Sequence, residues 1–294
     1  MKQLIITGDD YGLCAPVNQA IEECLAAGTM GATCVMTNMP ECGQAATLRS
    51  KFPRSSVGVH WNITQGRPVL GAVAVPSLVD EKGEFSAILR RRWLTRGVRP
   101  EEIRAELTAQ YEKFQALAGA ADFWNTHQNV HIFPGLFELF VAVGRELKIP
   151  AMRSHERHTL PARGSVAGYN LRHPAYWLKG QVIRRWSERA RAQGVQMPAG
   201  RLYLPGYQAG NYSLPLLLER IDWRGVSGAL ELVIHPATAA DSPVLGSLTD
   251  SRLREYQTFR EPRLVERTRR AGVALVGFEA LHRSGVHEHR EKAA

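Results

Sequence analysis

The sequence predicts an α/β fold built on a mainly parallel sheet, and two observations support this prediction. Short apolar segments with strand character alternate along most of the chain with longer segments of helical period. No obvious linker or internal repeat interrupts the alternation. Such alternation is typical of a parallel sheet that is either wound into a barrel or left open. One domain over residues 1–294 is therefore the simplest prediction.

Seven segments have the composition of strands, with Val, Ile, Thr and aromatic residues enriched. Most of them end in polar or titratable side chains, as in "LIITGDD" and "ELVIHP". The predicted strands are 3–8, 31–38, 56–64, 122–128, 149–154, 229–236 and 273–281.

Helices are predicted between the strands, with proline and glycine marking several of their ends. The first predicted helix begins at Pro16 and ends at Gly28, and the second begins at Pro100. In the second helix, apolar side chains recur at spacings of four, four and three residues from Ile103 to Phe114. Further helices are expected after Pro134 and over 252–271.

Two regions break the alternation. Segment 65–85 has no helical period, and segment 155–212 is longer than a normal connection, so we expect an irregular insertion there. Within it, 176–194 can form a helix with Leu178, Val182 and Trp186 on one face. This face is interpreted either as the packing stripe of an outer helix or as part of a basic amphipathic surface that meets an anionic or lipid-linked saccharide at a membrane.

Composition limits the class of protein. The net charge is +9, but the basic residues are mostly arginines spread along the chain, and no nucleic-acid-binding motif is present, so no nucleic-acid partner is predicted. All four cysteines lie in the first 42 residues without a C-x-x-C pair, which favours buried thiols. No signal peptide and no apolar run of about 18 residues is found, so we expect a cytoplasmic protein with a frayed tail around 284–294.

Titratable side chains cluster at the ends of the predicted strands. Because the carboxyl ends of parallel strands meet at one edge or mouth, these side chains are expected to converge. Two histidines and one carboxylate with an open position for water form a common catalytic metal site. The strand-end residues are Asp9, Asp10, His60, His127, His131, Arg153, Glu231 and His235.

The adjacent pair Asp9 and Asp10 needs a physical explanation, since neighbouring buried carboxylates repel each other. A metal ion would explain it: one carboxylate binds the cation, and the other stays unbound and accepts a proton from metal-bound water. The cation would also lower the pKa of that water towards about 7.

Six motifs that occur in order resemble those of the YdjC/ChbG carbohydrate deacetylases. They are "LIITGDDYGLCAPVNQAI", "GVHWNIT" followed by "GRPV", "PSLVDEKGEF", "NTHQNVHIFP", "IPAMR" and "ELVIHP", and they span residues 4–236. Members of that family resemble polysaccharide deacetylases in having a distorted (β/α) barrel and a divalent metal. The resemblance therefore implies a barrel of about seven parallel strands.

The resemblance also implies roles for individual residues. By motif position, Asp10, His60 and His127 would bind the metal, Asp9 would be the general base and His235 the general acid. Arg153 would orient Asp9 or the substrate, and the substrate pocket would include Asn129, His131 and Glu231. The family stretch usually reads His-x-His-x-His, whereas Asn129 occupies the middle position here.

The implied function is a metal-dependent hydrolase that removes an N-acetyl group from a free, oligomeric or lipid-linked amino sugar and releases acetate. We expect one divalent metal, zinc first and magnesium or another ion as alternatives, and we leave a homodimer open. One alternative function is hydrolysis of another amide or an ester, although a single ligand set disfavours two-metal phosphate chemistry. The other is a carbohydrate-binding protein that has lost catalytic activity. Asn129, in place of the usual His, leaves this alternative open.

Overall fold

The computed structural model describes residues 2–205, 214–239, 244–245 and 249–281. Eight strands in these residues form one sheet, in which every strand pairing is parallel. The path through the sheet is β4-β3-β2-β1-β7-β6-β5, and β8 pairs with the first half of β1. The strands are β1 (Lys2–Tyr11), β2 (Ala32–Val35), β3 (Ser56–Trp61), β4 (Trp124–Thr126), β5 (Arg157–Thr159), β6 (Gly200–Tyr203), β7 (Ala229–Ile234) and β8 (Val273–Val276).

The predicted strand at 149–154 is present only as two isolated bridges, and these bridges bend the sheet towards closure. Met152 pairs with Trp124 of β4, and Ala151 pairs with Gln196, which lies just ahead of β6. The backbone N–H of Arg153 donates to the Trp124 carbonyl at 3.1 Å, and that of Met152 donates to the Gln196 carbonyl at 2.9 Å. Hydrogen bonds therefore connect the β4 edge to the β6 side, as expected for a distorted barrel.

The segment 155–212 differs from the irregular insertion that we expected. It contributes β5 and β6 to the sheet, together with helices α6 (Val166–Arg172) and α7 (Pro174–Ala192). Both strands are short, which explains why the sequence pattern did not reveal them. The predicted tail at 284–294 lies outside the described residues.

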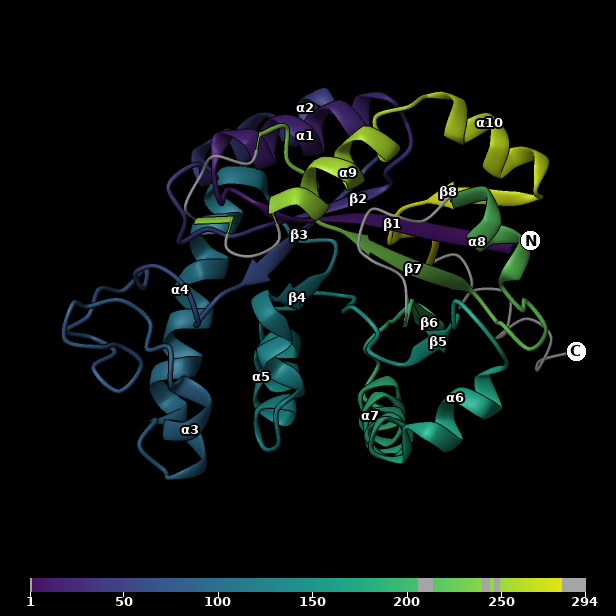
Figure 1. Cartoon of the computed structure of the whole chain (residues 1–294). Coiled ribbons are helices and arrows are strands. Elements are labelled where there is room, and N and C mark those ends of the chain that lie inside the picture. Colours follow the sequence, from purple (N-terminus) through teal and green to yellow (C-terminus); the bar gives the residue numbers. More distant parts are fainter. Residues whose placement is uncertain (1, 206–213, 240–243, 246–248, 282–294) are drawn as a thin grey trace, which may run out of the picture.

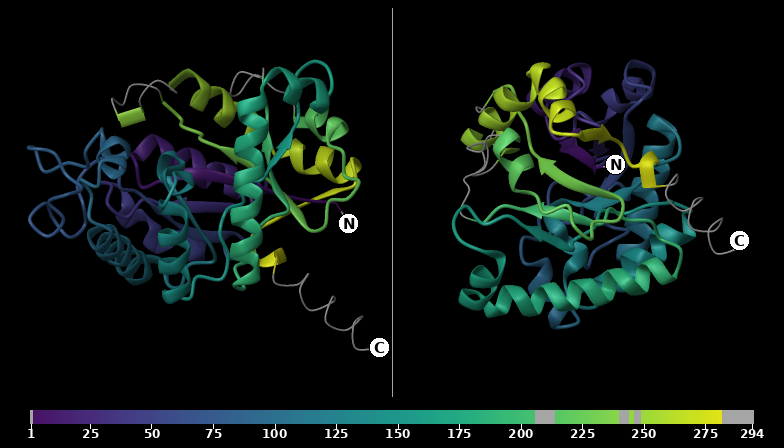
Figure 2. Two further views of the ribbon diagram at one scale, coloured as in Figure 1. Left: turned by 90° about the horizontal axis from the view of Figure 1, so that it is seen from below. Right: turned by 90° about the vertical axis from the view of Figure 1, so that its right-hand side faces the viewer.

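Helices cover both sides of the sheet. Figure 1 shows α1, α9 and α10 on one side and α4, α5 and α7 on the other, and Figure 2 shows the curl of the sheet between them. The predicted helix 252–271 is two helices, and Pro262, which lacks a backbone N–H, lies between them. The remaining helices are α1 (Ala15–Ala26), α2 (Leu48–Lys51), α3 (Leu89–Leu94), α4 (Pro100–Ala118), α5 (Leu136–Glu146), α8 (Leu214–Arg220), α9 (Thr249–Phe259) and α10 (Arg263–Arg270), with 3-10 helices η1 (Cys42–Thr47) and η2 (His127–Ile132).

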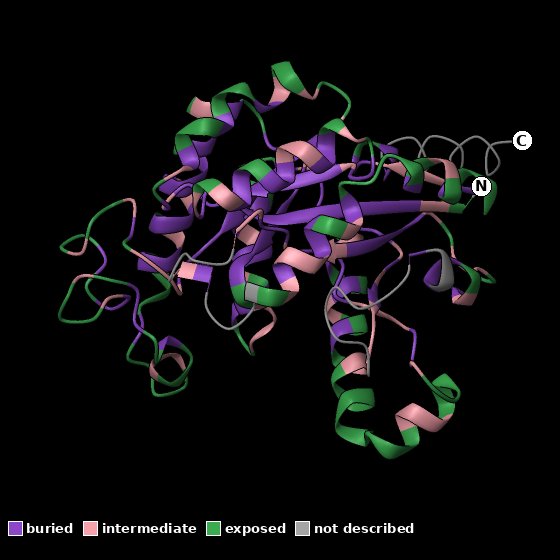
Figure 3. Ribbon diagram, turned by 45° about the horizontal axis from the view of Figure 1, so that its top comes forward, coloured by how far each residue is buried: buried purple, intermediate pink, exposed green. Residues whose placement is uncertain are grey.

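The core is built from the strands and the inner faces of these helices. Trp61, Trp124 and Phe140 pack together, with the two indole rings 5.0 Å apart. Figure 3 shows the central strands almost wholly buried, whereas β5 and most of β8 are partly exposed. Cys24, Cys34 and Cys42 are buried free thiols, as expected, and Cys14 is partly exposed. In the described part of the chain, no helix is long and apolar enough to cross a membrane.

Candidate metal and catalytic site

A bulge at the end of β1 brings Asp9 and Asp10 into one buried network. The register between β1 and β2 shifts between Gly8 and Tyr11, and Asp10 has a left-handed backbone with φ of 71°. Neighbouring side chains of a regular strand point to opposite faces, and a bulge interrupts that alternation. Both carboxylates are therefore buried near the carboxyl ends of β1, β3 and β4, where the predicted ligands also lie.

Asp10, His60 and His127 form a compact set of donor atoms. Asp10 Oδ1 lies 3.2 Å from His60 Nε2 and 3.0 Å from His127 Nδ1. His60 is part of β3, and His127 directly follows β4. The three donor atoms lie within 4.8 Å of one another, so they fit a single divalent cation of the kind held by histidines and a carboxylate.

Gln65, which sequence analysis did not single out, holds the far side of the His127 ring. The Gln65 side-chain amide donates to the Val244 carbonyl at 3.2 Å, and its Oε1 lies 2.9 Å from His127 Nε2. His127 Nε2 then carries a proton, which leaves Nδ1 as the nitrogen that faces Asp10 and is available to a cation. A shared cation stabilises that arrangement, so the donor set passes this test for a metal site.

Arg153 organises the second carboxylate. Its guanidinium donates to both oxygens of Asp9, at 2.6 and 2.7 Å, and to Glu231 Oε1 at 3.0 Å. Burial alone would raise the pKa of Asp9, but Arg153 outweighs burial and holds that pKa well below its usual range. The Thr7 hydroxyl also donates to Glu231 at 2.8 Å, and burial raises the pKa of Glu231.

Arg252 is the positive partner of Asp10, and no sequence pattern pointed to it. This buried side chain on α9 donates to Asp10 Oδ2 at 2.6 Å. Burial would raise the pKa of Asp10, but His127, His60 and Arg252 together hold it well below its usual range. Arg252 is 242 residues from Asp10 in sequence, in a helix rich in polar residues, so only the fold brings the two together.

His235 lies beside Asp9 at the end of β7. Its Nε2 is 3.7 Å from Asp9 Oδ2, and its side chain keeps 35% of its surface exposed. The backbone N–H of His235 donates to Glu255 Oε2 at 2.6 Å, so α9 also fixes this position. Partial desolvation, assisted by Arg252 and Arg153, lowers the pKa of His235 despite the nearby carboxylates.

Cys34 and Asn125 line the inner side of His60. Cys34 Sγ lies 3.3 Å from both His60 Nδ1 and Asp9 Oδ1, and burial raises the pKa of this thiol to about 11. In the amide orientation that satisfies both of its ends, Asn125 accepts from Arg153 and donates to His60 Nδ1. His60 Nε2 then carries the ring proton and directs it at Asp10, whereas binding a cation through Nε2 would require the ring proton on Nδ1, facing the Asn125 oxygen in the opposite amide orientation.

None of the three predicted substrate-binding residues contacts the proposed metal ligands, although Glu231 is hydrogen-bonded to Arg153. Asn129 has a left-handed backbone in η2, and its Oδ1 accepts from Arg201 at 3.3 Å. His131 is fully buried, with Nδ1 2.6 Å from the Thr126 hydroxyl, and burial lowers its pKa to about 3. Glu231 is also fully buried. Neither His131 nor Glu231 presents surface to a substrate in this structure.

Comparisons with known proteins agree with this architecture. Residues 3–270 match the family model of YdjC-like proteins. Chitooligosaccharide deacetylases of Yersinia pestis (strain Pestoides F) and Yersinia pseudotuberculosis (serotype O:1b) are 30% identical over 94% of this chain and 98% of their own length. A solved Enterococcus faecalis V583 protein, described as a candidate cellobiose-phosphate cleavage protein, aligns over 95% of this chain and 98% of its own, with a TM-score of 0.73 and 26% identity. The chain belongs to the YdjC-like protein family.

Proposed function

We propose that this protein is a metal-dependent hydrolase that removes an N-acetyl group from an amino sugar and releases acetate. The observation that carries the proposal is the separation of two adjacent carboxylates into two environments. Asp10 faces two imidazoles, whereas Asp9 faces Arg153 and His235. The deacetylase names of the relatives support the same chemistry and suggest oligosaccharides of N-acetylglucosamine as the first substrates to test.

Asp10, His60 and His127 would hold the cation. Zinc is our first choice because two imidazoles and one carboxylate match its usual catalytic ligands. When bound, such a cation polarises the acetamide carbonyl and supplies a water of lowered pKa. Asn129 points towards Arg201 and does not contact these three residues, so the substitution in the family motif leaves the donor set intact.

Asp9 would accept the proton of the attacking water. Arg153 binds both of its oxygens, which fixes the carboxylate and keeps it ionised at neutral pH. The arrangement resembles a base held by an orienting partner, since Glu231 accepts from Arg153 and Thr7 in turn donates to Glu231. The cost is a weaker base, because the same contacts favour the charged carboxylate.

His235 would protonate the leaving nitrogen. Its lowered pKa leaves the imidazole neutral at pH 7, so it would take up the proton that Asp9, 3.7 Å away, removes from water and pass one to the leaving nitrogen. Proton balance is then met within the pair: water gives one proton to Asp9, the amine receives one through His235, and acetate leaves. We assign Asn129, with Arg201, to the substrate-facing rim, and His131 and Glu231 to support of the site.

The test is acetate release from N-acetylated chitooligosaccharides by the purified protein, before and after treatment with a chelator. We expect release that stops on chelation and returns with added zinc. Sustained release from the chelated protein would refute metal dependence. A metal-loaded protein inactive on N-acetylated saccharides of every length and linkage tried, yet active on another amide or an ester, would refute the substrate assignment.

A further inference from the structure

Helices α6 and α7 form a hairpin whose corner lies outside the core. The helices meet at His173. No residue of α6 is buried, and the buried residues of α7 are Ile183, Ser187 and Ala190, all in its second half. Figure 3 shows this corner coloured as exposed, at the end of a projection from the body of the molecule.

Large apolar side chains gather at this corner. Leu171 is 84% exposed, Leu178 60% and Trp177 51%. Single exposed apolar residues are common, but a group on one projecting corner indicates an interaction surface. Of the two interpretations of this face, the packing stripe applies to Trp186, whose ring stacks on Phe137 at 5.2 Å, but not to Leu178 and Val182, which are exposed.

The same hairpin is strongly basic. Between positions 163 and 191, Glu188 is the one acidic residue. Leu178, Val182, Arg185 and Arg189 follow at spacings of four, three and four, so they share one face of α7. That face is apolar near the corner and cationic nearer the body. The basic residues are Arg163, Arg172, Lys179, Arg184, Arg185, Arg189 and Arg191.

We propose that the α6–α7 hairpin docks on an anionic lipid surface. Leu178 and Val182 would enter the boundary of the acyl region, and Trp177 at the corner would lie at headgroup level. Arg185 and Arg189 of the same face would meet the phosphates. A second copy of the chain is a poorer partner, because a twofold contact through this face would bring two strongly positive hairpins together. The proposal is independent of the deacetylase assignment.

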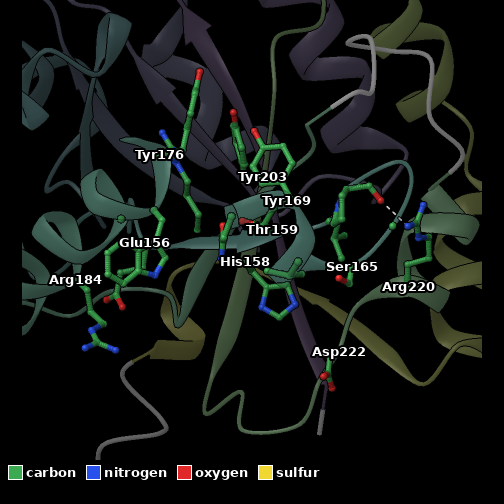
Figure 4. Close-up of a pocket in the computed structure, with 18 of the residues that line it drawn as sticks. Glu156, His158, Thr159, Ser165, Tyr169, Tyr176, Arg184, Tyr203, Arg220 and Asp222 are labelled. Carbon is green, nitrogen blue, oxygen red and sulfur yellow. Dashed lines mark hydrogen bonds between the residues drawn. The ribbon is translucent and has the colours of Figure 1, made fainter. Parts of the chain in front are cut away.

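Docking would bring a cavity close to the lipid headgroups. This cavity of about 550 Å³ is bordered by Tyr176, Trp177 and Arg184 of α7 and by side chains of β5 and β6. Figure 4 shows Tyr176, Tyr203 and Tyr169 gathered at one side of it. Arg157 lies over the rings of Tyr203 and Tyr176, at 4.5 and 5.0 Å from their centroids. None of the predicted metal or catalytic residues lines this cavity.

Vesicle flotation tests the proposal. The full-length protein is mixed with vesicles of phosphatidylcholine alone, or of phosphatidylcholine with phosphatidylglycerol, at low and high salt. We expect binding to the anionic vesicles that weakens with salt. Arg185→Gln/Arg189→Gln, which removes both cations of that α7 face, should weaken it by about tenfold or more, because basic residues near an anionic lipid surface contribute strongly to binding. Leu171→Ser/Leu178→Ser should weaken it by a similar factor.

Matched variants on α10 serve as controls. Arg263, Arg267 and Val265 are exposed on a second basic helix on the other side of the sheet. Arg263→Gln/Arg267→Gln and Val265→Ser should leave flotation unchanged, and thermal unfolding of each variant checks its fold. Equal binding to uncharged vesicles, or unchanged flotation of both hairpin variants, would overturn the proposal. The proposal would also be overturned if the lipid-free protein sedimented as a dimer and Leu171→Ser/Leu178→Ser dissociated that dimer.

Discussion

Asp9 and Asp10 are tolerated side by side because each has its own positive partner. Arg153 binds both oxygens of Asp9, and Arg252 donates to Asp10 Oδ2 while the two imidazoles face Oδ1. A buried charge is stable only when it is paired and hydrogen-bonded. The paired arginines therefore compensate much of the charge, and the proposed cation adds to them instead of acting alone.

Gln65 offers a test of how His127 is held. Replacing Gln65 by Leu removes the acceptor of the His127 Nε2 proton and leaves the three proposed ligands in place. Loss of such a partner typically lowers metal affinity about 10–100-fold. We expect a loss of this size in a competition titration with a chelating dye.

Asn129→Ala is the matched control for that titration, since Asn129 also lies near the site but contacts Arg201. It should retain the metal affinity of the unmodified protein. If Gln65→Leu bound zinc as tightly as this control, the proposed orientation of the His127 ring would be wrong.

That the proposed ligand residues lie together could be predicted from the sequence, whereas the residues that hold them could not. Asp10, His60 and His127 end or follow strands, and parallel strands bring their ends together by construction. Gln65 comes from a loop and Arg252 from a helix, and no periodicity marks either residue. The bulge at Asp10 was equally hidden, because a left-handed aspartate leaves no pattern in the sequence.

At the scale of elements, α9 contacts both the proposed metal ligand Asp10 and the proposed acid His235. Arg252 and Glu255 are three residues apart on this helix, so they share a face. The first binds the side chain of Asp10, and the second accepts the backbone N–H of His235. Movement of α9 would therefore disturb the proposed metal ligand and the proposed acid together.

Glu255 should make stability depend on pH. Burial raises the pKa of Glu255 to about 7, so the folded protein holds this proton over a range in which the unfolded chain has lost it. The contribution of Glu255 to folding therefore weakens as pH rises from about 4.5 to 7 and is constant above that range. Chemical unfolding at pH 5 and 7.5 should show Glu255→Gln gaining about 2 kcal/mol relative to the unmodified protein.

Comparing Glu255→Gln with the unmodified protein separates the titration of Glu255 from that of the other buried acids and histidines. Glutamine can still accept the His235 N–H, so the backbone contact is preserved. A difference in unfolding free energy that stays constant across this pH range would show that Glu255 is ionised in the folded state.

The short strands were the part of the fold that could not be predicted from the sequence. The segments 3–8, 56–64 and 229–236 were predicted well because apolar character continues through β1, β3 and β7. The strands β5 and β6 have three and four residues, too few to show a period. Pro150, which has no N–H to donate, lies within the segment 149–154 that forms bridges instead of a strand.

At the scale of the molecule, the proposed metal joins parts of the chain that are distant in sequence. Its ligands come from β1, β3 and the start of η2. A cation that binds the folded state and not the unfolded chain should stabilise by about 2.7 kcal/mol at one hundred times its dissociation constant. Thermal unfolding should therefore shift upwards with added zinc and downwards with chelator.

His60→Ala/His127→Ala should abolish the response to zinc, since two of the three proposed donors are gone. The variant also serves as the control for zinc bound elsewhere. An equal upward shift in the variant would place the stabilising ion at another site.

The central claim is that Asp10 holds the metal while Asp9 handles the proton, and Asp9→Asn tests it most directly. Asparagine keeps the shape of the side chain but cannot accept the proton from water. The measurement is acetate release from an N-acetylated chitooligosaccharide, on samples whose metal content is determined in parallel. The account predicts a metal content equal to that of the unmodified protein, with acetate release reduced at least about a hundredfold. Undiminished release, or loss of the metal with the activity, would contradict it.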